Sequence, residues 1–576
     1  MKHKRRSSRK ILGISPVGFN TSCTLLVDGK VVFAVEEERL TREKRTRSFP
    51  VQGIREALKT ASLRLQDLDA IAVSWNPAIN LEAFNLAQSQ RPRYLGELFY
   101  SVPNYLMALK EGNFAAAAEQ TLHFLDEAQV RVHYVTHHLA HAAAFFVSPY
   151  EEAAIMTVDA FGEKDCVTFN KGKANKIQSL WSQEFPHSLG SFYSAITEYL
   201  GFQAQSDEWK LMGASSYGDS NRFYPKLRSL IHWKNDDGFE LDLTHFNHYQ
   251  FHRPSRYTPK LIQHLGIPPN RRDQPLNAEQ YDLAAAAQRV TEEVYFRLLQ
   301  QLHARTRSKN LVLAGGVAFN SVANGKILEQ TPFRQVFIPP VPDDAGGSLG
   351  AAYHCHHQIF GQPRCHILRS NYFGPGFSNE EIRSLLRKFK INYSTHKDIA
   401  RTAAKLVASD KIIGWFQGRL EFGDRALGNR SILADPRDAS MKDRVNETVK
   451  YREPFRPFAP SILTEHINDY FENAVPTPFM EKVFMIREEK RKLIPAVTHV
   501  DGTGRLQTVD RKQNPLYWQL IDEFRKITGL PLVLNTSFNL KGEPMVCSPQ
   551  DAVRTFFSSG LDALVMGDCL LQKGHC

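Results

Sequence analysis

The sequence has few cysteines, and they follow no pattern. Seven are scattered over 576 residues without a repeating spacing, which excludes a disulfide framework and favours reduced thiols. No apolar run approaches the length of a membrane span. The basic N-terminus lacks the apolar core that a secretory or twin-arginine signal needs. We therefore expect a cytoplasmic protein with no membrane partner.

The net charge of +11 is unevenly distributed along the chain. Six of the positive residues lie within residues 1–10, and others gather at 42–47 and 487–492. Basic patches give nonspecific affinity for nucleic acid. A basic tail, together with anion-binding arginines inside a site, explains the charge better than a nucleic-acid partner.

Two stretches of the N-terminal half place a polar, glycine-containing loop between strands. Residues 11–35 predict three strands with tight turns, and helical patterns follow around 51–64 and 80–128. A similar strand–loop–strand pattern begins at 153 and carries Asp159, Gly162 and Glu163 in its loop. This weak internal repeat is typical of the duplicated sugar-kinase/actin ATPase fold, which presents phosphate-binding loops in this way.

A glycine pair, Gly315-Gly316, follows a predicted buried strand at 310–314 and precedes a helix that starts near Asn320. Such a pair lets a nucleotide lie against the backbone at a helix N-terminus. We expect these three residues to contact ATP. Further along, glycines and prolines between 358 and 378 mark a domain boundary.

Two histidines suggest a metal site. His137 and His141 are four residues apart and share one helical face, where two imidazoles can bind one ion. Asp344 from a later loop would complete a set of two histidines and one carboxylate, which suits divalent iron or a similar ion, with Mg²⁺ as an alternative. The other interpretation, a helix cap with core histidines, is the more common one for an isolated pair at this spacing.

Lys210 follows an aromatic helix and stands next to Glu208 and Trp209. Its ammonium group would bind a phosphate as a point charge, with Glu208 orienting it. A surface ion pair is the alternative, and the sequence alone does not separate the two.

The segment 411–436 predicts an anion site. It opens with an apolar run typical of a buried strand, and then Arg419, Arg425 and Arg430 recur among glycines. Glycines let the backbone approach a ligand, and arginines clamp carboxylates and phosphates. A small phosphate ester is the expected ligand.

Two short pairs support the same site. Lys450 and Arg452 are two residues apart, as are Ser537 and Asn539. On a strand, this spacing puts both side chains of a pair on one face. We expect the two pairs to surround one phosphorylated or carbonyl-bearing ligand. Strands are predicted in this half at 411–416, 458–464, 482–487 and 531–535.

Over nearly its whole length the chain resembles the O-carbamoyltransferases of the NodU/CmcH family, which modify nodulation factors and several antibiotics. The resemblance lies in these motifs: HHLAHA, LAGGVAFN, DAGGSLGAA, GWFQGRLEFGDRALGNRSILADPR, KYREPFRPFAPSIL, DGTGRLQTV and LNTSFNLKGEP. The N-terminal half is also similar to the tRNA threonylcarbamoyl transferase domain. The C-terminal half is similar to the YrdC-like threonylcarbamoyl-adenylate synthase domain, whose KxR and SxN residues match Lys450, Arg452, Ser537 and Asn539.

The resemblance implies an α/β chain with an N-terminal duplicated actin/sugar-kinase-like ATPase domain followed by a YrdC-like α+β domain. The expected boundaries are a basic tail at 1–10, the actin-like domain at 11–365, a linker at 366–380 and the YrdC-like domain at 381–576.

The resemblance also implies a reaction. The C-terminal domain would form carbamoyl-adenylate from carbamoyl phosphate and ATP, and the N-terminal domain would transfer the carbamoyl group to a hydroxyl of a small natural product. His137, His141, Lys210, Arg419 and Arg452 are the expected catalytic residues. The charge of the phosphates would be balanced by Arg425, Arg430 and Lys450. The metal ligand that aligns is Asp344 rather than Asp343.

Two positions depart from the family pattern. Trp209 stands where a glycine is expected, and Asp424 where many relatives have proline. One alternative function is a tRNA-modifying threonylcarbamoyl enzyme whose basic tail binds RNA; another is a non-catalytic nucleotide-binding regulator. The acceptor pocket is expected in variable loops, around 80–115 and 220–275, and a homodimer is expected from base rates.

Overall fold

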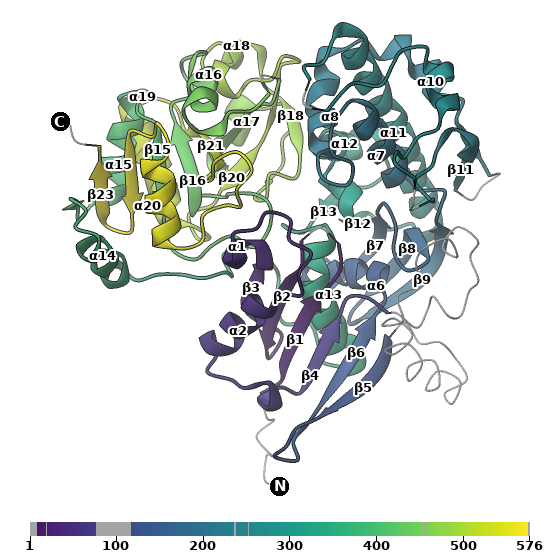
Figure 1. The fold of residues 1–576 in the computed structure, drawn as a ribbon, viewed down its shortest axis with the longest axis horizontal. Helices are drawn as coiled ribbons and strands as arrows, with labels where there is room; N and C mark the ends of the chain where they lie inside the picture. The colour runs from purple at the N-terminus through teal and green to yellow at the C-terminus, as the bar shows by residue number, and fades with distance from the viewer. Residues whose placement is uncertain are drawn as a thin grey trace. The chain divides into compact units, whose positions relative to one another are not determined.

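The structure is a computed structural model that describes residues 8–18, 20–76, 117–234, 238–250, 253–272, 274–453 and 455–573 (Figure 1). The chain forms two compact units. The first consists of Met1–Glu37 and Thr46–Leu368, and the second of Glu38–Arg45 and Arg369–Cys576. The change of unit after Leu368 falls inside the predicted linker, whereas the short stretch Glu38–Arg45 has no counterpart in the predicted domains.

The first unit begins with a mixed sheet in the order β3-β2-β1-β4-β6-β5. Its first three strands are antiparallel neighbours, and β4 and β6 continue the sheet parallel to β1. The strands β1, β2 and β3 confirm the three strands predicted within 11–35. The strands are β1 (Lys10–Ser15), β2 (Ser22–Val27), β3 (Lys30–Glu36), β4 (Ala70–Val73), β5 (Ala117–His123) and β6 (Gln129–Val135).

A second sheet of the same unit has the order β13-β12-β7-β8-β9. Here too the first three strands along the chain are antiparallel neighbours, and β12 and β13 follow parallel to β7. Apart from the additional antiparallel edge strand β5 of the first sheet, the two sheets therefore share a strand order and strand directions. The strands are β7 (Glu152–Val158), β8 (Asp165–Lys173), β9 (Lys176–Glu184), β12 (Asn310–Ala314) and β13 (Gln335–Phe337); a separate hairpin contains β10 (Ile231–Trp233) and β11 (Phe239–Leu241).

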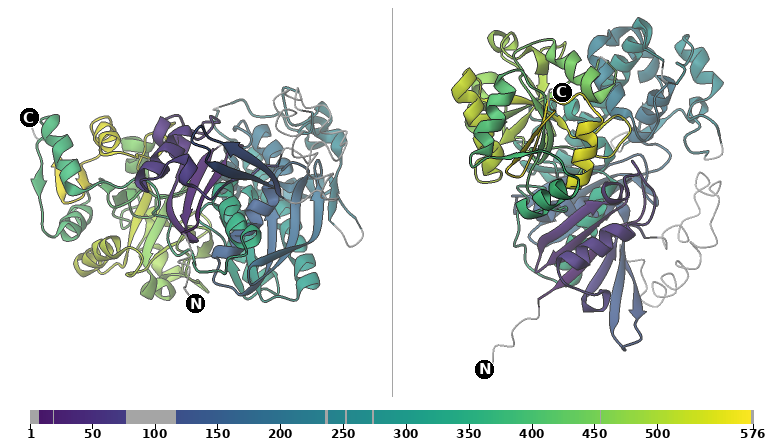
Figure 2. Two further views of the ribbon diagram at one scale, coloured as in Figure 1. Left: turned by 90° about the horizontal axis from the view of Figure 1, so that it is seen from below. Right: turned by 60° about the vertical axis from the view of Figure 1, so that its left-hand side comes forward.

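One helix of the first unit packs very closely against a strand and another helix. Figures 1 and 2 show α13 (Gly347–His354) lying along β1. The approach is so close that a Cβ at Gly13 would lie 1.9 Å from the carbonyl oxygen of Ser348, and one at Gly350 would lie 1.8 Å from that of Ala140. Glycine is required at both positions because any side chain would separate the packed backbones.

The other helices of the first unit include the 29-residue α11, which ends in a left-handed residue, Arg307. They are α1 (Glu37–Thr41), which runs into the second unit, α2 (Val51–Thr60), α6 (His137–Ala142), α7 (Leu189–Tyr199), α8 (Glu208–Ala214), α9 (Tyr224–Arg228), α10 (Pro259–Leu265), α11 (Ala278–Thr306) and α12 (Ser321–Gln330).

The helix predicted over 80–128 is wrong at its C-terminal end. Residues 117–123 form β5, which pairs with β6 along its full length. Pairing with a neighbouring strand outweighs the helix propensity of an alanine-rich stretch, because propensity is a weak local preference. Residues 80–116 of that predicted helix lie outside the described residues.

The second unit is built on a sheet of order β14-β23-β22-β15-β16-β21-β17-β20. Its apolar core lies between this sheet and α15, α19 and α20. The four strands predicted for this half are confirmed as β15, β17, β18 and β21. The strands are β14 (Ser394–Thr395), β15 (Ile413–Phe416), β16 (Arg430–Ala434), β17 (Ala459–Leu463), β20 (Gln507–Val509), β21 (Leu532–Ser537), β22 (Ala563–Met566) and β23 (Cys569–Gln572), with β18 (Val483–Met485) and β19 (Thr503–Arg505) as a separate pair.

Short and medium helices complete the second unit. They are α14 (Asn379–Lys388), α15 (Ile399–Ala408), α16 (Met441–Val445), α17 (Ile467–Tyr470), α18 (Glu488–Arg491), α19 (Pro515–Thr528) and α20 (Pro549–Phe557). Both units are thus mixed α/β, as expected, while their assignment to the actin-like and YrdC-like folds stays a prediction. Among the described helices, none is long and apolar enough to cross a lipid bilayer.

Candidate functional sites

Four side chains of the first unit converge on one point. His137 and His141 project from α6, and their Nε2 atoms lie 3.1 Å apart. The Nε2 atom of His141 lies 3.3 Å from an oxygen of Asp159, and that of His137 lies 3.4 Å from an oxygen of Asp344. One ligand atom from each of the four residues falls within 4.8 Å of the others. The sequence placed three of these residues together, and the structure adds Asp159, which was expected to contact the nucleotide instead.

Backbone contacts hold the members of this histidine–carboxylate cluster in place. Asp159 follows β7 and accepts hydrogen bonds from the backbone N–H groups of Ala160 and Gly316. Asp344 precedes α13, and a Cβ at Gly18 would lie 1.9 Å from its carboxylate. Gly18 therefore has to be glycine for the carboxylate to sit where it does.

Glu163 orients the histidine helix. Both of its carboxylate oxygens accept from the backbone N–H of His137, at 3.0 and 3.1 Å, and one also accepts from the N–H of Asn76 at 2.7 Å. Thr136, the residue before α6, makes no capping hydrogen bond with its side chain. Since Glu163 binds the helix N-terminus, the ring nitrogens of His137 and His141 are not needed for capping. This argues against the helix-cap interpretation.

The electrostatics of the cluster favour a cation at its centre. Burial lowers the pKa of His137, but hydrogen bonding and charge from Asp159 and Asp344 outweigh it and raise the pKa to about 9. Burial, followed by the charge of Asp159, raises the pKa of Asp344 to about 7. The carboxylates thus hold a proton on a buried imidazole. Two imidazole nitrogens and two carboxylate oxygens are also a donor set that fits a divalent transition metal.

The adjacent His138 has a different role. Its Nδ1 contacts the hydroxyl of Thr157 at 2.6 Å, and its Nε2 contacts the carbonyl oxygen of Asp165 at 2.9 Å. Burial and the neighbouring histidines lower its pKa to about 3. Gly162 lies against this ring, because a Cβ there would lie 2.9 Å from His138.

The glycine pair after β12 supports the cluster directly. Gly315 has a positive φ of 94°, and a Cβ on it would lie 2.3 Å from the carbonyl oxygen of Val158. Gly316 then donates its N–H to Asp159 at 2.9 Å. Asn320 caps α12 through Ala323, and its amide pairs with that of Gln288. ATP contacts by these residues stay a prediction.

Lys210 lies on α8 and forms an ion pair with Asp207 at 3.1 Å. Its ammonium group is 5.4 Å from the ring centre of Phe202. Trp209, at the position where a glycine is expected, donates its indole N–H to the carbonyl of Ser206. A phosphate-binding role for Lys210 stays a prediction.

Two of the three arginines expected to form a clamp in 411–436 bind backbone carbonyls. Arg430 is fully buried and donates to the carbonyl oxygens of Gln417, Asn429, Pro375 and Gly418. Arg419 donates to the carbonyls of Phe373 and Gly374. These bonds hold loop backbone together, and an anion-binding role for Arg419 and Arg430 stays a prediction.

The KxR and SxN pairs do meet. Ser537 is the last residue of β21, as the strand prediction expected, whereas Lys450, Arg452 and Asn539 lie outside strands. Lys450 ends a π-helical turn, Asn446–Lys450, and the next residue has a positive φ of 45°. The ammonium group of Lys450 donates to the side-chain oxygens of Asn539 at 2.8 Å and Ser537 at 3.2 Å. Burial, then the charges of Arg452, Arg456 and Lys44, lowers its pKa well below the usual range.

A group of arginines surrounds this lysine. Arg452 donates through Nε to Asn446 and lies 4.2 Å above the ring of Phe458, while its Nη2 is buried without a partner among the described residues. Burial, and then mutual repulsion within the set, lowers the pKa of Arg452 and of Arg505 well below the usual range. We call this set the arginine cluster; it consists of Arg425, Arg452, Arg456 and Arg505.

Two members of the arginine cluster were missed by the sequence interpretation. Arg456 and Arg505 stand in the segments KYREPFRPFAPSIL and DGTGRLQTV, which carried the family resemblance. The signal was therefore present in the motifs, but no periodicity connects residues from separate loops. Four mutually repelling guanidinium groups indicate a site for a polyanion.

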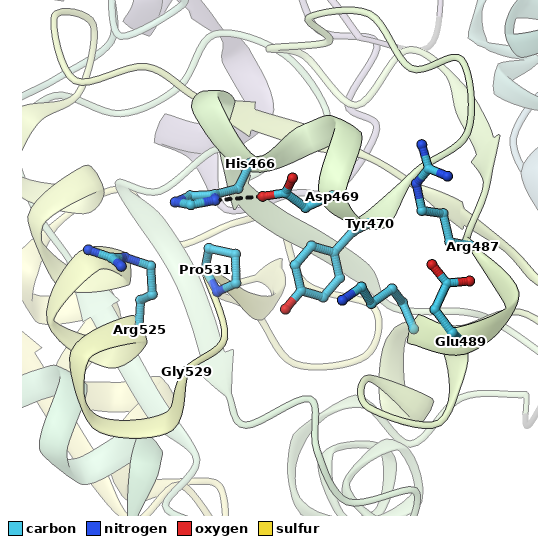
Figure 3. A pocket seen from close by; sticks show the side chains of 9 residues that line it. His466, Asp469, Tyr470, Arg487, Glu489, Arg525, Gly529 and Pro531 are labelled. Atoms are coloured by element: carbon cyan, nitrogen blue, oxygen red, sulfur yellow. Dashed lines mark hydrogen bonds and ion pairs between the residues drawn. The ribbon is translucent and has the colours of Figure 1, made fainter.

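A further hollow in the second unit has a volume of about 500 Å³ and contains none of the predicted site residues. Figure 3 shows His466 turned toward the carboxylate of Asp469, at 2.9 Å, with Tyr470 beside them. Acidic and basic side chains are mixed there, so the lining favours no single ligand charge.

Comparison with known proteins decides the family. The sequence profile described as "Carbamoyltransferase N-terminus" matches residues 10–353, and the one described as "Carbamoyltransferase C-terminus" matches residues 404–573. The chain belongs to the carbamoyltransferase family. It is accordingly a transferase.

Relatives in this family match most of the chain. An uncharacterized protein of Synechocystis sp. is 37% identical over 98% of this chain and 96% of its own length. Nodulation protein NolNO of Sinorhizobium fredii is 38% identical over 96% of this chain and 78% of its own length. Among solved structures, T. kodakarensis HypF covers 61% of this chain and 48% of its own at 14% identity, with a TM-score of 0.31, which is too low to inform the fold.

Proposed function

We propose that this carbamoyltransferase is an ATP-dependent O-carbamoyltransferase with two reaction sites. Carbamoyl phosphate and ATP would react in the second unit to give carbamoyl-adenylate. The carbamoyl group would then be transferred, in the first unit, to a hydroxyl of a small natural product. Family membership supports carbamoyl transfer. The division into two steps is supported by the histidine–carboxylate cluster of the first unit, which suits a cation, and by the arginine cluster of the second unit, which suits an anion.

The observation that carries the proposal is the arginine cluster around Lys450. Carbamoyl phosphate and ATP are both polyanions, and adenylate formation separates pyrophosphate from AMP. Preorganised cations stabilise the charge that accumulates in such a transition state. Arg452 and Arg505 each keep a buried donor nitrogen without a partner in the described part of the chain, which a phosphate oxygen would satisfy.

The histidine–carboxylate cluster would hold the metal of the transfer step. His137, His141, Asp159 and Asp344 are the ligands, and a bound divalent ion would polarise the carbamoyl carbonyl or bind phosphate oxygens. Glu163 keeps the histidines aligned through the helix N-terminus. Because the cluster is buried, it also protects the reactive carbamoyl group from water.

A direct test uses the full chain with ATP and labelled carbamoyl phosphate. We expect AMP and pyrophosphate to form only when carbamoyl phosphate is present. Arg452→Ala should abolish this reaction, while Arg444→Ala, which removes a partly exposed arginine paired with Asp410, should not. Adenylate formation that requires threonine and bicarbonate instead would favour the tRNA-modifying alternative. Mass spectrometry of products from a panel of hydroxylated metabolites would identify the acceptor.

A further inference from the structure

A tight turn in the second unit presents a histidine beside the arginine cluster. The turn runs from His499 to Thr503 and closes with two backbone hydrogen bonds, from the N–H of His499 to the carbonyl of Thr503 and from the N–H of Gly502 to the carbonyl of His499. Gly502 has a φ of 78°, a conformation that glycine adopts without strain. The turn leads directly into β19, which ends at Arg505.

The side chains of this turn fix the tautomer of the histidine. The hydroxyl of Thr503 donates to the carboxylate of Asp501 at 2.7 Å. A hydroxyl has one proton to donate, so its 3.0 Å contact with Nδ1 of His499 requires the imidazole to donate there. The chain Asp501–Thr503–His499 therefore leaves Nε2 as an unprotonated lone pair. This Nε2 is buried and has no partner among the described residues.

Strand geometry places the imidazole on the side of Arg505. Side chains alternate along β19, so Thr503 and Arg505 share one face and Gly504 takes the other. That other face is the core side, since a Cβ at Gly504 would lie 3.2 Å from Ile486. His499, bonded to Thr503, thus lies on the face from which Arg505 joins the arginine cluster.

The charges around the imidazole explain how it would respond to a ligand. Burial lowers the pKa of His499 to about 4; Asp501 opposes this shift, and Arg505 and Lys442 add to it. The ring is therefore neutral and able to accept a proton near pH 7. A bound phosphate would offset the two cations and raise the basicity of Nε2 toward the range in which a general base works best.

We propose that Nε2 of His499 accepts a proton from the water molecule that cleaves carbamoyl phosphate. The water oxygen bonds to phosphorus, the bond between phosphorus and the carbamoyl oxygen breaks, and carbamate and inorganic phosphate are released. The proton on His499 passes to the departing phosphate or to solvent. Carbamate then attacks the α-phosphorus of ATP, and pyrophosphate leaves. The inference deepens the proposed function and rests on it, because it names the group that drives the first half of adenylate formation.

The test compares two carbamoyl sources in the full chain. His499→Gln should reduce AMP formation from ATP and carbamoyl phosphate by about 100-fold or more, the usual contribution of a general base. With ammonium carbamate in place of carbamoyl phosphate, the same variant should form AMP at close to the wild-type rate, because the step that needs the base is bypassed. His466→Ala, which removes a histidine outside the arginine cluster, is the matched control and should behave as wild type with both sources.

Each other result is informative. Equal losses with carbamoyl phosphate and with carbamate would show that His499 only maintains the shape of the site, and would overturn the inference. An unchanged rate with carbamoyl phosphate would overturn it as well. If wild-type protein forms no AMP from carbamoyl phosphate, the proposed function fails first and the inference falls with it. Thr503→Val provides a second check, since it removes the hydroxyl that fixes the tautomer and should reduce only the reaction with carbamoyl phosphate.

Discussion

The guanidinium group of Arg430 lies 3.6 Å above the centre of the Phe416 ring. Arg430 begins β16 and pairs directly with Phe416 on β15, so the stack joins two strands of the central sheet. Four backbone carbonyls accept from the same guanidinium. This arginine therefore organises the loop between the two strands.

Replacing Arg430 and Arg425 separately distinguishes a structural role from a role in binding. Arg430→Ala leaves buried carbonyls without donors, and each such group costs about 1–3 kcal/mol. We expect a clear fall in the unfolding temperature, by several degrees, measured by calorimetry. Arg425→Ala should leave the unfolding temperature nearly unchanged and instead weaken ATP-dependent AMP formation. The reverse pattern would show that Arg430 is the anion ligand.

Two glycines of the second unit differ in how strictly they are required. Gly428 has a φ of 106°, and a Cβ on it would lie 2.2 Å from the ring of Tyr517. Gly529, which ends α19, has a φ of 81° but open space around it. Gly529→Ala should thus cost only about 1–2 kcal/mol of backbone strain, whereas Gly428→Ala should cost more, because Tyr517 is buried and has to move. Urea unfolding of both variants checks the order.

The sequence predicted the parts of this structure that depend on local periodicity. Apolar runs located β15 and β21, and the helical period put His137 and His141 on one face. It did not predict the partners of Arg430, because the carbonyls that it binds come from loops whose shape no period describes. For the same reason Arg456 and Arg505 were missed although their motifs were recognised. The prediction of a strand at Lys450 failed because a π-helical turn delivers the lysine to Asn539.

Buried histidines predict a loss of stability in acid. Burial lowers the pKa of His248 and His354 to about 4, from an ordinary value of 6.5. The unfolded chain therefore binds protons first as the pH falls. Stability is complete above pH 6.5 and is lost on the way to pH 4, at about 1.4 kcal/mol per pH unit for each group.

His248→Phe tests this pH dependence. The ring of His248 packs near Phe185 and Phe246, and Nε2 donates to the carbonyl of Pro186 at 2.8 Å. The phenyl ring keeps the packing, but it can neither donate the hydrogen bond to Pro186 nor bind a proton. We expect lower stability at pH 7 and a shallower decline between pH 6.5 and pH 5, measured by thermal unfolding at each pH. An unchanged slope would contradict the assignment.

Removing one ligand of the histidine–carboxylate cluster should separate the two proposed steps. His141→Ala deletes an imidazole whose Nε2 lies 3.1 Å from that of His137 and 3.3 Å from Asp159, so a bound metal would lose one of four donors. We expect metal content, measured by mass spectrometry of the purified protein, to fall at least 10-fold, together with carbamoyl transfer to the acceptor. Pyrophosphate release from ATP in the presence of carbamoyl phosphate should persist, because adenylate formation depends on the arginine cluster of the second unit. His123→Ala, at an exposed position on β5, is the control and should keep both metal and transfer. A His141→Ala protein with full metal content would show that the four side chains form only a buried ion-pair network.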